Sequence, residues 1–256
     1  MLIVLSEPFS MIKFCFGLTF LSVILFSCSK DPVVYVSPDV HDYFPLSVGK
    51  YITYQLDSTL FINFGQKDTL VSYQAKDEVT AQTTDNLGRP AYVIVRYLRQ
   101  DTSQSWMPNN TFLAVPTAHS IEYIQNNLRF LKLEMPVKDG FSWLGNSYID
   151  TYSVYSDVQF MAGWNYTYDS VGVPLTLNSS IIDSTLKVDE RDEFLGQDPS
   201  IPGTQYGEKT FSVEKYAKGI GLVYRDFIHW EYQGGQTGAP GYYVGYGETL
   251  TMLNHN

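Results

Sequence analysis

The segment at residues 51–56, YITYQL, places Ile52, Tyr54 and Leu56 on one face of an extended chain and more polar residues on the other. This period of two is typical of a half-buried β-strand. Similar segments follow, among them TLVSYQAKDEVTAQT, AYVIVRYLRQ, NNLRFLKLEMP, KTFSVEKYA and GLVYRDFIHWEYQ. No segment longer than a turn or two shows capping residues together with the apolar spacing of a helix, and residues 154–162 come nearest to that pattern. We predict an all-β fold, a curved antiparallel sheet forming a half-barrel or a sandwich, with at most short helices besides a signal segment.

Composition supports a folded β protein and narrows its partners. Aromatic residues make up 15% of the chain, with 20 Tyr and 15 Phe, which is too rich for disorder and favours strands. The formal net charge is −10. A chain this acidic repels phosphate backbones, so we predict no nucleic-acid partner.

An apolar run at residues 14–26 follows Lys13. It is shorter than the roughly 20 residues that a membrane-spanning helix needs, and it matches the apolar region of a secretory signal. Met11 is the natural start of such a signal, so we interpret residues 1–10 as an over-extended start. The competing interpretation is an N-terminal membrane anchor.

The end of this run, Leu25-Phe26-Ser27-Cys28, resembles the processing motif of bacterial lipoproteins. Phe26 departs from the pattern, which usually has a small residue there. The resemblance implies that Cys28 becomes the first mature residue and carries the lipid, and Ser29 after it implies the outer membrane. Two or more acyl chains would anchor the protein to the membrane stably.

These features divide the chain into a signal peptide at 1–27, a lipidated tether at 28–42 and one β domain at 43–256. Cys15 lies in the signal, so the mature chain has no second thiol for a disulfide and must be stabilised by its core. Two segments, 45–49 (PLSVG) and 136–140 (PVKDG), share a proline and a glycine ahead of an expected strand. We interpret both as turns, and a duplicated half-domain is the alternative.

Four longer segments, YFPLSVGKYITYQ, MPVKDGFSWLGN, EKYAKGIGLVYRD and LTMLNHN, resemble a group of uncharacterised Gram-negative lipoproteins. Phe-Pro-Leu…Gly, Pro…Gly…Trp and Tyr-Ala…Gly-Leu-Val strand motifs recur there in this order. The resemblance covers most of residues 43–256 and implies a curved antiparallel sheet, by analogy with the half-barrel of Lol-type lipoprotein carriers. The motifs are structural, and the group has no assigned activity.

Motifs for metal and cofactor chemistry are weak. The run KVDERDEFLGQD offers candidate metal ligands, Asp189, Glu190, Asp192 and Glu193. Their spacing is not that of an EF-hand, and a solvated acidic loop is the default interpretation. GIGLVY, residues 219–224, lacks the third glycine and the βαβ unit of a dinucleotide site, so we predict no cofactor.

The four histidines are scattered, without the spacing of a zinc site or a recognisable triad. Within GLVYRDFIHWEYQ, alternation predicts that Ile228, Trp230 and Tyr232 are buried and that His229 and Glu231 are exposed.

Aromatic residues in turn-rich segments are the candidate ligand-binding residues. They are Trp106, Trp164, Tyr166, Tyr242, Tyr243 and Tyr246. Exposed rings can stack on sugars or hold an apolar ligand, whereas packing at strand ends is the commoner role of such residues.

These observations favour a lipid-anchored cell-envelope protein that is a non-catalytic binding or carrier module. Its partners would be the membrane, through the lipid, and an apolar small molecule, a glycan or another envelope protein. The alternative is an envelope-facing hydrolase with paired carboxylates, and the third hypothesis is a structural subunit. A concave apolar pocket would favour binding, two acids facing one cleft would favour hydrolysis, and a flat exposed apolar patch would favour a subunit.

Overall fold

A computed structural model of the chain describes residues 35–256, so the expected signal peptide and Cys28 lie outside the described residues. The compact unit that carries the sheet is Ser37–Asn256. The sequence placed residues 28–42 in the tether and residues 43–256 in the β domain. Val40 and Tyr43, in the short 3-10 helix η1 (Val40–Tyr43), are buried in the core. The Ser37 Oγ accepts a hydrogen bond from the Val137 N–H at 2.7 Å.

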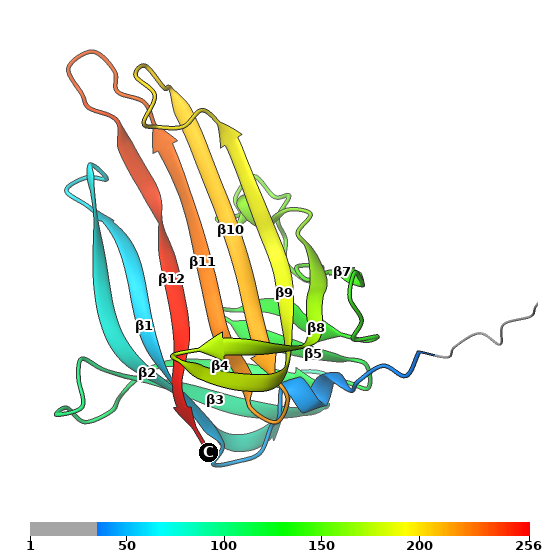
Figure 1. Ribbon diagram of the computed structural model, residues 1–256. Helices are drawn as coiled ribbons and strands as arrows, with labels where there is room; N and C mark the ends of the chain where they lie inside the picture. Colours follow the sequence, from blue (N-terminus) through cyan, green and yellow to red (C-terminus); the bar gives the residue numbers. More distant parts are fainter. Residues whose placement is uncertain (1–34) are drawn as a thin grey trace, which may run out of the picture. The chain divides into compact units, whose positions relative to one another are not determined.

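Within residues 35–256, one sheet of twelve strands forms almost all of the fold (Figure 1). The strands are β1 (Tyr51–Ile62), β2 (Lys67–Thr84), β3 (Pro90–Arg99), β4 (Met107–Pro116), β5 (Ser120–Gln125), β6 (Leu128–Glu134), β7 (Ser142–Leu144), β8 (Asn165–Leu177), β9 (Ser180–Gly196), β10 (Tyr206–Ala217), β11 (Gly221–Gln233) and β12 (Tyr242–His255). The predicted all-β class is therefore confirmed. The 3-10 helix η2 (Gln159–Met161) lies within residues 154–162, the segment whose sequence comes nearest to a helical pattern. No helix in the described part is long and apolar enough to cross a membrane.

The order β6-β5-β4-β3-β2-β1-β12-β11-β10-β9-β8-β7 consists of two antiparallel meanders of six strands, joined where β1 pairs with β12. The two outer strands nearly meet and almost close the sheet into a barrel. The Leu131 N–H on β6 donates to the Gly145 carbonyl just after β7 at 2.8 Å. The Trp143 indole N–H on β7 donates to the Leu131 carbonyl at 2.7 Å.

The two Pro…Gly segments are turns, as predicted, and each leads into the first strand of one meander. Gly49 and Gly140 have φ values of 91° and 78°, which glycine adopts without a steric cost. The Gly49 N–H donates to Val79 on β2 at 2.8 Å, and the Gly140 N–H donates to Tyr168 on β8 at 2.9 Å. Each turn is thus bonded to the second strand of its own meander, as the duplicated half-domain would require.

Burial follows the predicted alternation in β1 and reverses it in β11. Ile52, Tyr54 and Leu56 are buried, as expected. On β11, however, Phe227 and His229 are buried, whereas Ile228, Trp230 and Tyr232 are only partly buried, so that prediction was wrong.

His229 is buried because the interior supplies partners for its ring. Its Nδ1 lies 2.9 Å from the Thr210 hydroxyl, and Phe160 stacks on the ring at a centroid distance of 3.7 Å. Alternation in β11 separates the two faces correctly, but contacts with other strands decide which face becomes the interior.

Candidate functional site

The interior of the curved sheet contains a lysine between two glutamates. Lys132 on β6 donates from Nζ to Glu190 Oε1 on β9 at 2.9 Å and to Glu214 Oε1 on β10 at 2.7 Å. The second oxygen of each carboxylate is also bonded, because the Ser212 and Tyr216 hydroxyls donate to Glu190 and Glu214 at 2.5 Å each. Strand β6 lies far from β9 and β10 in the sheet order, so only strong curvature brings these groups together.

Arg225 extends this cluster across the interior. Its Nη1 donates to Glu248 Oε1 on β12 at 2.9 Å, and its Nε lies 3.6 Å from Glu214 Oε1. Arg96 on β3 lies 3.9 Å from the same Glu248 oxygen and forms two hydrogen bonds of 2.7 Å to Asp77 on β2. We call this set the ion-pair chain: Lys132, Glu190, Glu214, Arg225, Glu248, Arg96 and Asp77.

The two glutamates of the chain differ in proton affinity. Burial raises the pKa of the Glu190 carboxyl, and the nearby Glu214 charge raises it further. Burial acts in the same direction on Glu214, but Lys132 and Arg225 outweigh it and lower the pKa of that carboxyl. A proton taken up by the pair is therefore held by Glu190 rather than by Glu214.

A cavity of about 510 Å³, the larger cavity, adjoins the ion-pair chain. Half of its lining residues are apolar or aromatic: Leu128, Phe130, Val158, Phe160, Met161, Trp164, Tyr166, Phe227 and Tyr246. The other half are polar: Gln125, Asn126, Lys132, Asp150, Ser156, Asp157, Glu190, Ser212 and Arg225. A concave space that combines aromatic rings with placed polar groups is characteristic of small-molecule sites.

A second, smaller cavity of about 80 Å³ also adjoins the ion-pair chain, and Lys132 and Arg225 line both cavities. The two glutamates, however, line different ones. Glu190 lines the larger cavity, whereas Glu214 lines the smaller. The two buried carboxylates that share Lys132 are therefore divided between two spaces.

Three of the six candidate aromatic residues meet at the larger cavity, namely Trp164, Tyr166 and Tyr246. Trp164 and Tyr166 are 2% and 1% exposed, so both also pack in the core. Their polar atoms are bonded, since the Trp164 N–H donates to the Phe160 carbonyl at 2.8 Å and the Tyr166 hydroxyl donates to Asn146 at 3.0 Å. The rings of Trp164 and Tyr166 thus pack in the core and line the larger cavity at the same time.

The other three candidates lie elsewhere. Trp106 contacts the Arg99 guanidinium, which lies 4.2 Å from the ring centroid. Tyr243 stacks on Phe61 at 5.2 Å, and the adjacent Tyr242 is 41% exposed. None of the three lines either cavity.

The acidic run is part of strand β9 and not the solvated loop that the sequence favoured. The Asp189 and Asp192 carboxylates form ion pairs with Lys187 and Lys209 at 3.0 and 2.5 Å. Glu193 pairs with Arg191, and Glu190 belongs to the ion-pair chain. Across residues 35–256, no three His, Cys, Asp or Glu side chains come together as metal ligands would.

Sequence reasoning missed the charged residues of the site, above all Lys132, Glu214 and Arg225. A weak signal was present in LRFLKLE, where Leu128, Phe130 and Lys132 share one phase of the alternation. A lysine in phase with apolar residues is a candidate for burial, but nothing in the sequence identifies its partners.

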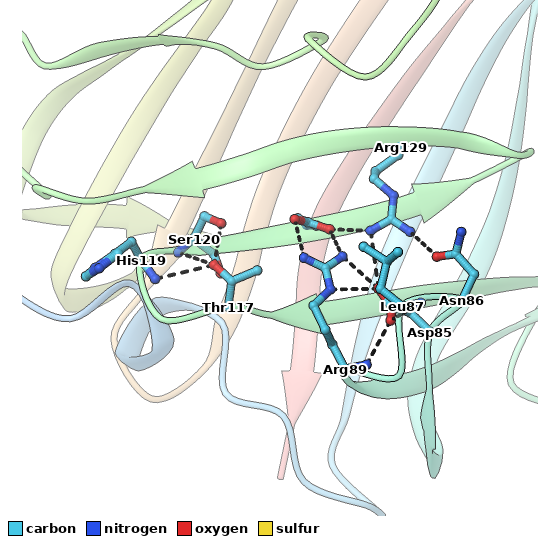
Figure 2. Close-up of polar contacts among 9 residues, drawn as sticks. Asp85, Asn86, Leu87, Arg89, Thr117, His119, Ser120 and Arg129 are labelled. Carbon is cyan, nitrogen blue, oxygen red and sulfur yellow. Dashed lines mark hydrogen bonds and ion pairs between the residues drawn. The ribbon is translucent and has the colours of Figure 1, made fainter.

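A second charged cluster fixes the β2–β3 turn and has a structural role. The Arg89 guanidinium donates to Asp85 at 2.6 and 2.8 Å and to Glu122 at 2.8 and 3.0 Å (Figure 2). Arg129 on β6 pairs with Glu122 as well. Every carboxylate here faces a guanidinium, so the cluster joins the turn to β5 and β6.

Thr117, His119 and Ser120, also in Figure 2, belong to the β4–β5 turn. The Thr117 and Ser120 hydroxyls lie 2.7 Å apart, and His119 donates its backbone N–H to the Thr117 hydroxyl. These bonds hold the turn, and the imidazole ring of His119 takes no part in them.

No protein-family model matches the sequence, and no curated protein matches it. Among solved structures, the chain is similar to a protein of Bacteroides fragilis NCTC 9343 that is inferred to be exported and has a YmcC-like fold. The identity is 10%, the alignment covers 83% of this chain and 99% of that one, and the TM-score is 0.37. This similarity is too low to transfer the properties of that protein to this chain.

Proposed function

We propose that this chain is a lipid-anchored protein of the cell envelope that binds an apolar small molecule inside its curved sheet and does not transform it. The larger cavity is the observation that carries the proposal. Its volume of about 510 Å³ suits a small organic ligand, and aromatic and aliphatic side chains make up half of its lining residues. The cell-envelope location rests on the apolar run at 14–26 and on the motif that ends at Cys28.

An apolar ligand is favoured over a glycan because of where the rings lie. Trp164 and Tyr166 line the larger cavity, and both are almost fully buried among other core side chains. A sugar would need free hydrogen-bonding groups around it, whereas the Lys132, Glu190 and Ser212 side chains of the wall are already bonded to one another. The more exposed rings of Tyr242 and Tyr243 lie away from this cavity.

The alternative function, a hydrolase with paired carboxylates, has one observation in its favour. Glu190 and Glu214 share a lysine and have pKa values shifted in opposite directions, which is the pattern of an acid–base pair. A substrate must contact both groups, however, and the two line different cavities. Binding without turnover therefore accounts for the geometry better.

The test is uptake of an apolar probe without any oxygen, 6-propyl-2-(dimethylamino)naphthalene. Native mass spectrometry of the full chain, released from detergent micelles, should show one bound probe. Val158 lines the larger cavity and is half-buried, so Val158→Trp should fill the space and largely abolish binding.

The matched control is Val154→Trp, in the same loop, because Val154 is 81% exposed and does not line the cavity. This variant should bind like the unchanged protein. Equal binding by both tryptophan variants, or no uptake by the unchanged protein, would refute the cavity as the ligand site.

A further inference from the structure

The larger cavity meets solvent beside two aspartates. Asp150 and Asp157 line it, and both are exposed, so they lie where the cavity opens. Asp150 Oδ1 accepts hydrogen bonds from the backbone N–H groups of Tyr152 and Ser153 at 3.1 and 3.0 Å. In the described part of the chain, neither carboxylate forms an ion pair with a lysine, an arginine or a histidine. We call this part of the cavity, next to Asp150 and Asp157, the acidic opening.

The buried part of the cavity wall already contains cations of the protein itself. Lys132 Nζ lies 5.2 Å from the ring centroid of Phe130 and 5.7 Å from that of Tyr166. The Arg225 guanidinium lies 5.5 Å from the ring centroid of Phe227. Aromatic faces attract cations, but Lys132 and Arg225 would repel a further positive charge beside these rings. The buried part of the cavity therefore suits an uncharged, apolar group.

A negatively charged ligand would find no unpaired cation in the wall. Lys132 donates to Glu190 and Glu214, and Arg225 donates to Glu248. The positive charges of the lining are thus already paired with carboxylates, whereas the negative charges at the acidic opening are not. An anion would be repelled at the opening and would compete with bonded glutamates inside. The charges of the lining therefore favour a positively charged group, held at the acidic opening.

We propose, building on the proposed function, that the ligand is an amphiphile with one positive charge, an ammonium or quaternary ammonium group on an apolar body. The charged group lies at the acidic opening, near Asp150 and Asp157. The apolar body reaches the buried rings of Phe130, Tyr166 and Phe227. The two aspartates thus determine the charge and the orientation of the ligand, and the rings supply the apolar contact.

The test uses three naphthalene probes that differ at the end of a short arm. The ammonium probe is trimethyl-[2-(2-naphthyl)ethyl]ammonium. Its uncharged match is 2-(3,3-dimethylbutyl)naphthalene, in which a carbon replaces the nitrogen, and the anionic probe is 3-(2-naphthyl)propanoate. Each probe is titrated separately into the full chain in nonionic detergent micelles, and native mass spectrometry gives the bound fraction. The unchanged protein should bind both the ammonium probe and the uncharged probe.

Asp150→Asn combined with Asp157→Asn removes both charges of the acidic opening. Asparagine keeps a side-chain oxygen that can accept the N–H groups of Tyr152 and Ser153, so the loop is preserved. This double variant should bind the ammonium probe about fivefold more weakly, because two exposed ion pairs are lost. It should bind the uncharged probe as before and the anionic probe more tightly. Each probe is compared with itself, so its partition into micelles does not affect the result.

The matched control is Asp68→Asn combined with Asp183→Asn. Both aspartates are exposed, on β2 and β9, and neither lines a cavity. This control removes the same charge from the protein and should leave the affinity for each of the three probes unchanged.

Equal affinity of the two double variants for the ammonium probe would overturn the role of the acidic opening. An equal loss of affinity for the ammonium and uncharged probes in the Asp150→Asn, Asp157→Asn variant would overturn the role of charge. Uptake of the uncharged probe but not of the ammonium probe by the unchanged protein would overturn this proposal and leave the proposed function intact. Uptake of none of the probes would overturn both.

Discussion

At the scale of single residues, Lys132 is the side chain on which the charged interior most depends. Its side chain is 9% exposed, and its ammonium group lies between two carboxylates that are themselves almost fully buried. A buried ion pair of this kind adds little stability over an apolar replacement of the whole set. Removal of one partner is costly, because the remaining charges stay buried without compensation.

Lys132→Met is therefore expected to lower the free energy of unfolding by about 3–5 kcal/mol, measured by urea denaturation. The control is Lys209→Met, because Lys209 pairs with the exposed Asp192 at 2.5 Å. That change should cost at most about 1 kcal/mol. Adding Glu190→Gln and Glu214→Gln to Lys132→Met should recover much of the loss. Equal effects of the two lysine changes would contradict a buried role for Lys132.

Asp85 gives a prediction for the dependence of stability on pH. Hydrogen bonds from the Arg89 side chain, with backbone N–H groups of Arg89 and Leu87, lower the pKa of Asp85 from 3.8 to about 2. The folded state thus favours the ionised carboxylate. Its contribution is present above the unfolded pKa and is lost as the pH falls through the folded pKa.

The free energy of unfolding should accordingly decrease between about pH 4 and about pH 2, and Asp85→Asn should make this decrease less steep. Denaturant titrations across this range measure the slope. Asp68→Asn, at an exposed position of β2, should leave the slope unchanged. A slope that Asp85→Asn does not alter would show that this turn contributes nothing to acid sensitivity.

At the scale of elements, the near-closure of the sheet depends on the contact between β6 and the residues after β7. The backbone bond from Leu131 to Gly145 joins them, and Gly145 lies directly against the ring of Tyr166. A methyl group at Gly145 would lie 2.3 Å from a ring carbon of Tyr166, which no real contact allows. Glycine is therefore required here by close packing and not by backbone conformation.

Gly145→Ala is expected to destabilise the protein by about 1–3 kcal/mol through this overpacking. It should also speed hydrogen exchange at the Leu131 amide, since that bond closes the sheet. The control is Gly247→Ala in β12, where the added methyl would lie 3.3 Å from Thr59 Cβ. That variant should change stability less and leave the Leu131 amide protected. If the Leu131 amide exchanges no faster in either variant than in the unchanged protein, the role given to Gly145 is contradicted.

At the scale of the whole molecule, the proposed anchor predicts where the protein is found in the cell. Cys28→Ser should prevent lipidation and leave the chain uncleaved at this site or released as a soluble form. Mass spectrometry of the protein from membrane and soluble fractions measures both outcomes. An intact chain that starts at Met1 with an unmodified Cys28 would contradict the anchor.

The sequence alone sufficed for the class of fold. Period-two alternation predicted the strands, and in β1 it also predicted the buried face of Ile52, Tyr54 and Leu56. These predictions succeeded because alternation is a local property of the chain. Of the proposed aromatic site residues, Trp164, Tyr166 and Tyr246 line the larger cavity, and their role in ligand binding stays a prediction.

Only the tertiary structure decided which face of each strand turns inward and which charges meet there. Lys132 lies 58 residues from Glu190 and 82 from Glu214 along the chain, and Arg225 is on yet another strand. Strand pairing and curvature bring these groups together, and both arise from contacts across the whole sheet. The burial of His229 and the charged wall of the larger cavity follow from that curvature, since period two separates the faces of a strand without saying which one becomes the interior.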